Sequence, residues 1–397
     1  MLRRSLPVLS QVNVEVRHPI SQENFTLLEG TYGALTEDHQ DPLSAVSVAN
    51  SSLSIDLWKG CPWQCAYCHV QGSKRNLDDA GVMPNKVSRH SPFSEAQVLD
   101  ALVDHPFFIP HQTILSIGTS STEPLANGEV EKSTFELLRI LRARKLRNPV
   151  WIVTKNHVAH KRLHDIKLFC ETGAVLIFSP TINGLDSSIE PLQGDRFKNW
   201  REVSLAGARV ALYLRPLVRE WGSDEKKVSE ILEKFKKEMR DVMPAAIVPG
   251  GLRWTDGIDY GLQVRGLQWP QNLPRIENGK DLDDALWHHI VQEAQRLFPG
   301  VAIVHHSSCA LSTILMRSDL SLVFNHAASE CQESHCSLQQ RAACNQANAN
   351  LRENELEIQQ AVLSELGLCE SVNVGVLPYA IRRTLQKIVA DRVRVNY

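Results

Sequence analysis

Short apolar runs alternate with longer amphipathic segments between residues 113 and 248, and this alternation constrains the fold more than any other feature of the chain. The runs, expected to be strands, are 113–117, 150–153, 175–178, 210–214 and 245–248. The segments between them, expected to be helices, are 131–145, 158–171, 197–206 and 224–240. Strands that need no polar face are typical of a parallel sheet covered by crossover helices. The pattern therefore predicts an α/β fold.

A sixth apolar run, 54–58, precedes the alternation and brings the expected parallel sheet to six strands. Six strands suit either a doubly wound sheet or an incomplete barrel, and the pattern does not separate the two. In both folds the chemistry lies at the carboxyl ends of the strands. The polar residues that directly follow each strand are therefore the candidates for a site.

Three cysteines follow the first of these strands closely, at Cys61, Cys65 and Cys68. A structural zinc site normally has four protein ligands, so three thiols on one loop favour a centre with an open position. An iron–sulfur cluster held by three cysteines leaves one iron free. The alternatives are a c-type haem attachment string at 65–69 and a zinc site or redox dithiol. His69 is interpreted as a neighbour and not as a ligand.

Cys61, Cys65, Tyr67 and Cys68 also fill the pattern C-x3-C-x-aromatic-C, which resembles the radical S-adenosylmethionine (radical SAM) family. The resemblance implies a partial (β/α)6 TIM-like barrel with a 4Fe-4S cluster on these three cysteines. It also implies reductive cleavage of S-adenosylmethionine to a 5′-deoxyadenosyl radical that abstracts hydrogen from a substrate. An electron donor such as flavodoxin or ferredoxin would reduce the cluster. Tyr67 would pack on the adenine, or be part of the core at the barrel mouth.

The polar segments after the later strands extend the resemblance over roughly residues 50–220. Their order, 121–124, 154–155, 179–181 and 190–196, is similar to the spore photoproduct lyase branch of the family, which carries Thr-Asp-Pro where this chain has Thr-Glu-Pro. The cofactor-binding residues implied are Gly118, Glu123, Lys155, Ser179 and Arg196.

By this resemblance Glu123 binds the amino group of S-adenosylmethionine and Ser179 lies near the ribose. Other interpretations are structural. Lys155 would cap a strand end in solvent, Ser179 would begin a turn, and Glu190 and Arg196 would form a surface ion pair of small value.

A second cysteine group lies near the carboxyl end, with three histidines beside it. Its cysteines are Cys309, Cys331, Cys336 and Cys344. Four thiols suit a structural zinc or an auxiliary iron–sulfur cluster, of which the cluster is favoured in a chain that already carries one. Simple buried cysteines are the third interpretation. The spore photoproduct lyase branch does not generally carry this group, which leaves the substrate open.

The chain is predicted to divide into an N-terminal extension at 1–50, a radical SAM core at 51–250 and a mainly helical C-terminal domain at 251–397. Further helices are expected at 94–102, 281–297, 351–366 and 379–393, with a loop-rich connection before the second of these. The last helix is basic, and a basic helix can follow phosphates. Its positive residues are Arg382, Arg383, Lys387, Arg392 and Arg394.

Composition narrows the function classes. A formal net charge of −2 gives no global basic field, so nucleic-acid binding would depend on a local patch. No apolar run approaches the ~18 residues of a membrane span, and nine cysteines are too few for a disulfide scaffold. Without an N-terminal apolar signal region, a cytoplasmic protein is expected.

Partners remain open. The substrate could be a nucleic-acid lesion, a peptide or a metabolite. The rival from another class is a zinc-bearing nucleic-acid-binding protein with two cysteine clusters.

Overall fold

The computed structural model describes residues 13–17, 24–28, 41–48, 52–72, 84–103, 105, 108, 110–191, 195–275, 280–318 and 335–353. Cys331 and the basic tail with its expected helix at 379–393 lie outside these ranges. Within them, no helix combines the length and the apolar character needed to cross a membrane.

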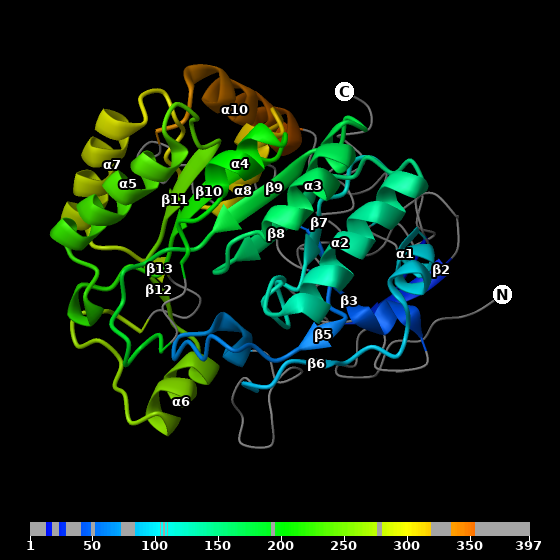
Figure 1. Ribbon diagram of the computed structural model, residues 1–397, viewed down its shortest axis with the longest axis horizontal. Helices are drawn as coiled ribbons and strands as arrows, with labels where there is room; N and C mark the ends of the chain where they lie inside the picture. The colour runs from blue at the N-terminus through cyan, green and yellow to red at the C-terminus, as the bar shows by residue number, and fades with distance from the viewer. Residues whose placement is uncertain are drawn as a thin grey trace.

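Seven strands form the main sheet (Figure 1). They are β3 (Val46–Val48), β4 (Leu53–Ile55), β7 (Leu115–Ile117), β8 (Val150–Thr154), β9 (Leu176–Pro180), β10 (Arg209–Leu214) and β11 (Ala246–Pro249). The spatial order is β11-β10-β9-β8-β7-β4-β3, and only the β3–β4 pair is antiparallel. The expected α/β fold with a mostly parallel sheet is therefore confirmed.

The six parallel strands, β4 to β11, lie beside one another in the same order as in the chain. A doubly wound sheet reverses this order at a switch point, where its ligand binds. No reversal occurs among the described strands. The topology is that of a singly wound sheet and is compatible with a partial TIM-like barrel.

Helices cover one face of this sheet in chain order, each packed against the next (Figure 1). They are α1 (Glu95–Val103), α2 (Gly128–Ala143), α3 (Leu163–Cys170), α4 (Trp200–Leu205), α5 (Glu225–Met239) and α7 (Asp284–Leu297). The other face receives α8 (Ser307–Ile314), and α10 (Leu338–Glu353) follows it. The expected crossover helices are thus present.

Alternating residues of each strand divide the core into two layers. Ile152, Phe178 and Leu212 face the outer helices, while Ile177 and Tyr213 face the side on which α8 packs. Burial on both faces removes the need for polar residues along a strand, which explains the continuous apolar runs.

Helix starts follow from capping side chains. Asn127 accepts hydrogen bonds from the N–H groups of Glu129 and Val130, so α2 begins three residues before the expected 131. Asp224 and Asp283 cap α5 and α7 in the same way. These caps set the boundaries that apolar periodicity alone places only approximately.

The expected single strand at 54–58 is wrong. β4 ends at Ile55, and β5 (Trp58–Lys59) pairs instead with β6 (Ser88–Arg89). The break falls at Asp56, whose carboxylate accepts hydrogen bonds from Ser47 Oγ at 2.7 Å and Ser121 Oγ at 2.8 Å. These bonds turn the chain away from the sheet.

Four further elements lie where none was expected, and one expected helix begins earlier than predicted. The N-terminal extension contains the hairpin of β1 (Asn13–Arg17) and β2 (Asn24–Leu28), together with β3. The loop-rich connection contains α6 (Asp256–Val264), because Thr255 caps it and its apolar side outweighs the cost of two helical glycines. The helix expected at 351 begins already at 338, where Ser337 Oγ accepts from Gln340 N at 3.1 Å.

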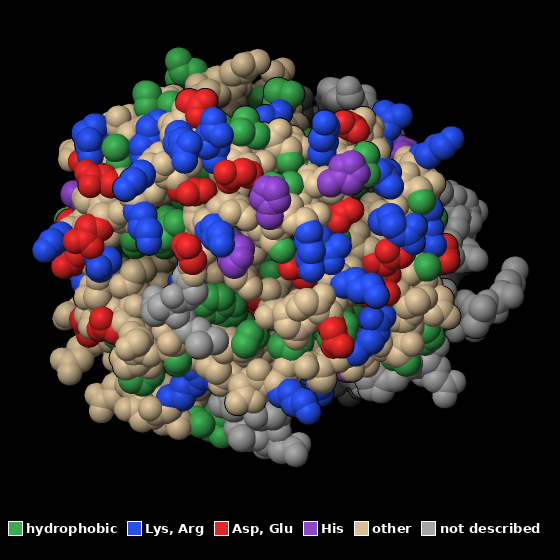
Figure 2. All heavy atoms as spheres, viewed as in Figure 1, with side chains coloured by type: hydrophobic (Ala, Val, Ile, Leu, Met, Phe, Trp, Pro, Cys, Tyr) green, Lys and Arg blue, Asp and Glu red, His purple; other side chains and the backbone are tan. Residues whose placement is uncertain are grey.

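On the face drawn in Figure 2, Lys and Arg side chains are interspersed with Asp and Glu over the helical layer. Several form exposed ion pairs, such as Arg139 with Glu136. Interspersed charges of both signs do not form the single-sign patch that a polyanion such as a nucleic acid would bind. This face therefore provides no extended basic surface.

Candidate functional site at the strand ends

The three-cysteine loop lies at the carboxyl ends of the parallel strands and is anchored to its neighbours by backbone contacts. Gly60 has φ +90°, and a Cβ there would lie 2.3 Å from the Lys86 carbonyl oxygen, so only glycine fits this turn. Gly60 also bridges to Thr122, whose hydroxyl donates to the Gly60 carbonyl at 2.6 Å. The loop after β4 is thereby joined to the loop after β7.

The loop also sits on an apolar cluster formed by the segments that follow β9, β10 and β11. Ala66 is fully buried in this cluster and donates its N–H to the Ile189 carbonyl at 2.9 Å. From the α6 side, Arg265 donates to the Gln64 carbonyl. Segments up to 200 residues away in sequence therefore hold the loop in place.

Cys65 is buried, and Cys61 and Cys68 are half-buried. Burial raises the pKa of all three thiols, that of Cys68 to about 11. Glu123 and the other two thiols add to the rise in the pKa of Cys61. Lys155 opposes this effect at Cys65, because its Nζ donates to the Cys65 sulfur at 2.8 Å.

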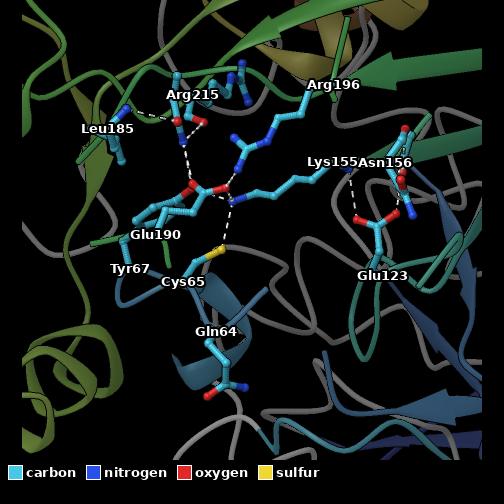
Figure 3. A network of polar contacts seen from close by, with 12 residues as sticks. Gln64, Cys65, Tyr67, Glu123, Lys155, Asn156, Leu185, Glu190, Arg196 and Arg215 are labelled. Carbon is cyan, nitrogen blue, oxygen red and sulfur yellow. Dashed lines mark hydrogen bonds and ion pairs between the residues drawn. The ribbon is translucent and has the colours of Figure 1, made fainter. Parts of the chain in front are cut away.

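A buried network of polar side chains surrounds Lys155 (Figure 3). Its centre is Glu190, whose side chain is 0% exposed and accepts from Lys155 Nζ at 2.9 Å. Arg196 donates to the same carboxylate from another direction, and Tyr67 donates its hydroxyl to it. Asn183 Nδ2 donates to Glu190 at 2.9 Å and to the Tyr67 hydroxyl at 2.7 Å. The expected surface ion pair of Glu190 and Arg196 is therefore wrong, because both side chains are buried.

The network carries one net positive charge, and that charge faces sulfur. Burial raises the pKa of Glu190, but Lys155, Arg196 and the hydrogen bonds from Tyr67 and Asn183 together hold it below the ordinary value. Burial raises the pKa of Tyr67 well above its ordinary value, which keeps the phenol neutral. Two cations and one carboxylate leave one positive charge, and the Lys155 ammonium brings it to Cys65. Lys155 therefore offsets part of the cost of ionising Cys65, whose pKa stays raised by burial, and places a positive charge where an anionic ligand could lie beside the loop.

Glu123 contacts the end of β8 and the residue that follows it. Its carboxylate accepts from Lys155 N at 2.9 Å, from Leu125 N at 3.3 Å and from the Thr154 hydroxyl. Burial raises the pKa of Glu123. The residue lies beside the network, as Figure 3 shows, and fixes the end of β8. Its expected contact with an amino group stays a prediction.

Of the other expected cofactor residues, Ser179 and Gly118 lie apart from this network, whereas Tyr67 belongs to it. Ser179 accepts from Trp151 Nε1 at 2.9 Å on the α8 side of β9. Gly118 forms a turn with φ +69° after β7. Tyr67 has Lys155 Nζ 4.7 Å from its ring centroid and packs on the apolar cluster below the loop. Of the residues expected around the cofactor, the structure brings Tyr67, Lys155 and Arg196 together.

Sequence reasoning missed two residues of the site. Asn183 lies two positions beyond the polar segment noted after β9, and its place as the fourth partner of Glu190 follows only from the tertiary fold. Asp56 was included in an expected strand, although an aspartate directly after an apolar run was a usable signal. Both are almost fully buried, at 1% and 6% exposed.

Two of the C-terminal cysteines, Cys309 and Cys336, lie on the opposite side of the sheet from the helical layer. Cys309 is buried in α8 within the apolar cluster against β8 to β11, and Cys336 packs on the same cluster. Cys344 accepts from Gln340 Nε2 at 3.3 Å in α10. A metal site made by these three and Cys331 stays a prediction, since Cys331 lies outside the described residues.

Among the described residues, no group of three or more His, Cys, Asp or Glu side chains is already arranged to hold a metal ion. The donors of the cysteine loop nevertheless fit an iron–sulfur cluster in kind and number. Thiolates are its usual ligands, and three of them leave one iron open. The positively charged Lys155 ammonium lies beside one of these sulfurs, that of Cys65.

No protein-family model matches the chain, and a search of curated proteins finds no match. The functional assignment therefore rests on the site itself.

Proposed function

We propose that the chain is a radical SAM enzyme in which Cys61, Cys65 and Cys68 hold a 4Fe-4S cluster. The sheet, in this proposal, is the partial (β/α)6 barrel of that family, and the cysteine loop follows its first parallel strand. When bound, the cluster and S-adenosylmethionine would supply a 5′-deoxyadenosyl radical for hydrogen abstraction from a substrate.

One observation carries the proposal: the Lys155 ammonium, held by Glu190, lies 2.8 Å from the sulfur of Cys65 at the carboxyl edge of the parallel strands. A structural zinc loop needs four ligands and no buried charged network. A cofactor site places a small number of polar or charged groups at fixed positions. Glu190 and Lys155 are such groups beside the cysteine loop.

The protein's own residues would then have distinct tasks. Glu190 holds Lys155 and Arg196 in place, so both cations keep fixed positions beside the cysteine loop. Lys155 and Arg196 together exceed the charge of Glu190 by one, and Lys155 would meet an anionic part of the cofactor, such as its carboxylate, because its ammonium lies beside the cysteine loop. The apolar cluster under Ala66 excludes water from the back of the loop.

The test is to reconstitute the chain with iron and sulfide under anaerobic conditions, add a strong reductant and S-adenosylmethionine, and measure 5′-deoxyadenosine. The proposal expects a brown protein and 5′-deoxyadenosine well above the level in a sample without protein. A colourless protein that retains zinc and leaves S-adenosylmethionine intact would favour the zinc-bearing rival.

A further inference from the structure

Arg215 is a cation that the proposed chemistry does not use. It follows β10 and therefore lies at the same edge of the sheet as the cysteine loop. Asn183 links the two places, since its Nδ2 donates both to the Tyr67 hydroxyl and to the Arg215 carbonyl, the latter at 3.2 Å. Figure 3 shows Arg215 at the border of the polar network.

The guanidinium contacts neutral acceptors. Nη1 donates to Ser307 Oγ and Nη2 to the His305 carbonyl, both at 3.0 Å. Nε is buried and makes no hydrogen bond to any described residue. No carboxylate of the described residues pairs with this guanidinium, in contrast to Arg196 with Glu190. Burying a positive charge without a nearby negative charge costs free energy. A bound anion would offset that cost for the Arg215 guanidinium.

The residues around the Arg215 guanidinium add to the positive electrostatic potential there. Ser307 is the first residue of α8, and the amino end of a helix carries partial positive charge. The guanidinium lies over the Tyr213 ring, 4.8 Å from its centroid. Burial lowers the pKa of Arg215, as expected of a cation kept from water without an acidic partner.

Space for the side chain is provided by a glycine. A Cβ at Gly250 would lie 3.0 Å from Arg215 Nε and 3.3 Å from its Cγ, so the side chain runs across the bare backbone at the end of β11. An alanine at position 250 would contact the Arg215 side chain and displace it. Gly250 therefore provides the space that this conformation of Arg215 needs.

We propose that Arg215 binds an oxygen anion, a phosphate or carboxylate group, of the substrate. That this anion is part of a substrate rests on the proposed function, whereas anion binding by Arg215 does not require the cluster. Arginine suits this role because its planar fork can donate two parallel hydrogen bonds to such a group.

The experiment measures thermal unfolding of the full-length chain, with and without reconstituted cluster, against rising inorganic phosphate, acetate or chloride at constant ionic strength. A ligand that binds the folded state raises the unfolding temperature with its concentration. We expect phosphate or acetate to stabilise the protein more than chloride does. The more effective of the two identifies the group as a phosphate or as a carboxylate.

Variants locate the effect. Arg215→Gln should raise the dissociation constant for the effective anion at least about tenfold, which corresponds to about 1.4 kcal/mol. Arg215→Lys should retain part of the affinity, and Gly250→Ala should weaken it with the charge still present. Gly128→Ala, where a Cβ meets nothing within 4 Å, is the matched control and should bind as wild type does.

Equal stabilisation by all three anions, or a folded Arg215→Gln variant with wild-type affinity, would overturn the proposal. Loss of 5′-deoxyadenosine formation with anion binding intact would instead count against the proposed radical SAM function alone.

Discussion

The two groups of cysteines have similar sequence signatures but different surroundings in the folded chain. Cys61, Cys65 and Cys68 lie on a loop at the strand ends, beside buried cations held by Glu190. Cys309 and Cys336 lie in or on an apolar cluster against the opposite side of the sheet from the outer helices, with Arg215 as the charge near Cys309. Cysteine spacing indicates a metal in both places, whereas among the described residues a carboxylate that holds two buried cations lies only beside the first group. The proposed chemistry is therefore placed at the first group.

The largest expected effect is that of Cys65→Ala. It removes the sulfur that Lys155 contacts, and the variant should lose about four iron atoms per chain together with nearly all formation of 5′-deoxyadenosine. Iron analysis and a product assay after anaerobic reconstitution measure both. Cys170→Ala is the matched control, because Cys170 lies in α3 away from both groups and should leave both values unchanged.

The same variant sharpens the comparison between the two groups. Any iron or zinc that Cys65→Ala still retains belongs to the C-terminal cysteines, and Cys309→Ala should then remove it. A Cys65→Ala protein with the full wild-type iron content would show that the cysteine loop is not a cluster site.

Glu190→Gln should be the most destabilising change in the polar network. It leaves Lys155 and Arg196 buried without their carboxylate, and breaking one partner of a buried ion pair costs about 3–5 kcal/mol. Denaturant unfolding of the metal-free chain measures the loss. Glu136→Gln breaks an exposed pair with Arg139 and should cost far less, because solvent screens that pair. Equal losses in the two variants would contradict the structural role assigned to Glu190.

Gly60→Ala should destabilise the cysteine loop by about 1–3 kcal/mol, since it forces a side chain into a left-handed turn and against the Lys86 carbonyl. Iron retention should fall with it. The measurement is denaturant unfolding with iron analysis, and Gly128→Ala serves as the control. Wild-type stability and iron content in Gly60→Ala would mean that the tight turn does not shape the site.

A smaller effect concerns pH. The folded-state pKa of Glu190 is lowered, so its ionised form adds stability that is fully present above the ordinary value of 4.5 and is lost as the pH falls through the folded pKa. The wild-type free energy of unfolding should therefore decrease more steeply below pH 4.5 than that of Glu190→Gln. Parallel curves for the two proteins would contradict the lowered pKa.

Much of the fold could be predicted because parallel strands buried on both faces leave continuous apolar runs, as at Val150–Thr154. The order of the strands in the sheet could not be predicted, because no local sequence pattern distinguishes a singly wound sheet from a doubly wound one. The break after Ile55 was missed because the hydroxyls that bind Asp56 come from three separate segments.

The candidate site divides in the same way. Cys61, Cys65 and Cys68 are recognisable from spacing, and Lys155 and Arg196 from their place after strands. The central position of Glu190 was not predictable, because its partners Tyr67, Lys155, Asn183 and Arg196 come from separate segments that only the folded sheet brings together.

The central claim is that the three cysteines hold a cluster with one iron open to S-adenosylmethionine. Electron paramagnetic resonance of the reduced, reconstituted chain tests it most directly, with spectra recorded before and after S-adenosylmethionine is added. We predict the signal of a reduced 4Fe-4S cluster, and we expect this signal to change when S-adenosylmethionine is added. The Cys65→Ala variant should lack this signal. A signal that S-adenosylmethionine leaves unchanged, or one that survives unaltered in Cys65→Ala, would contradict the claim.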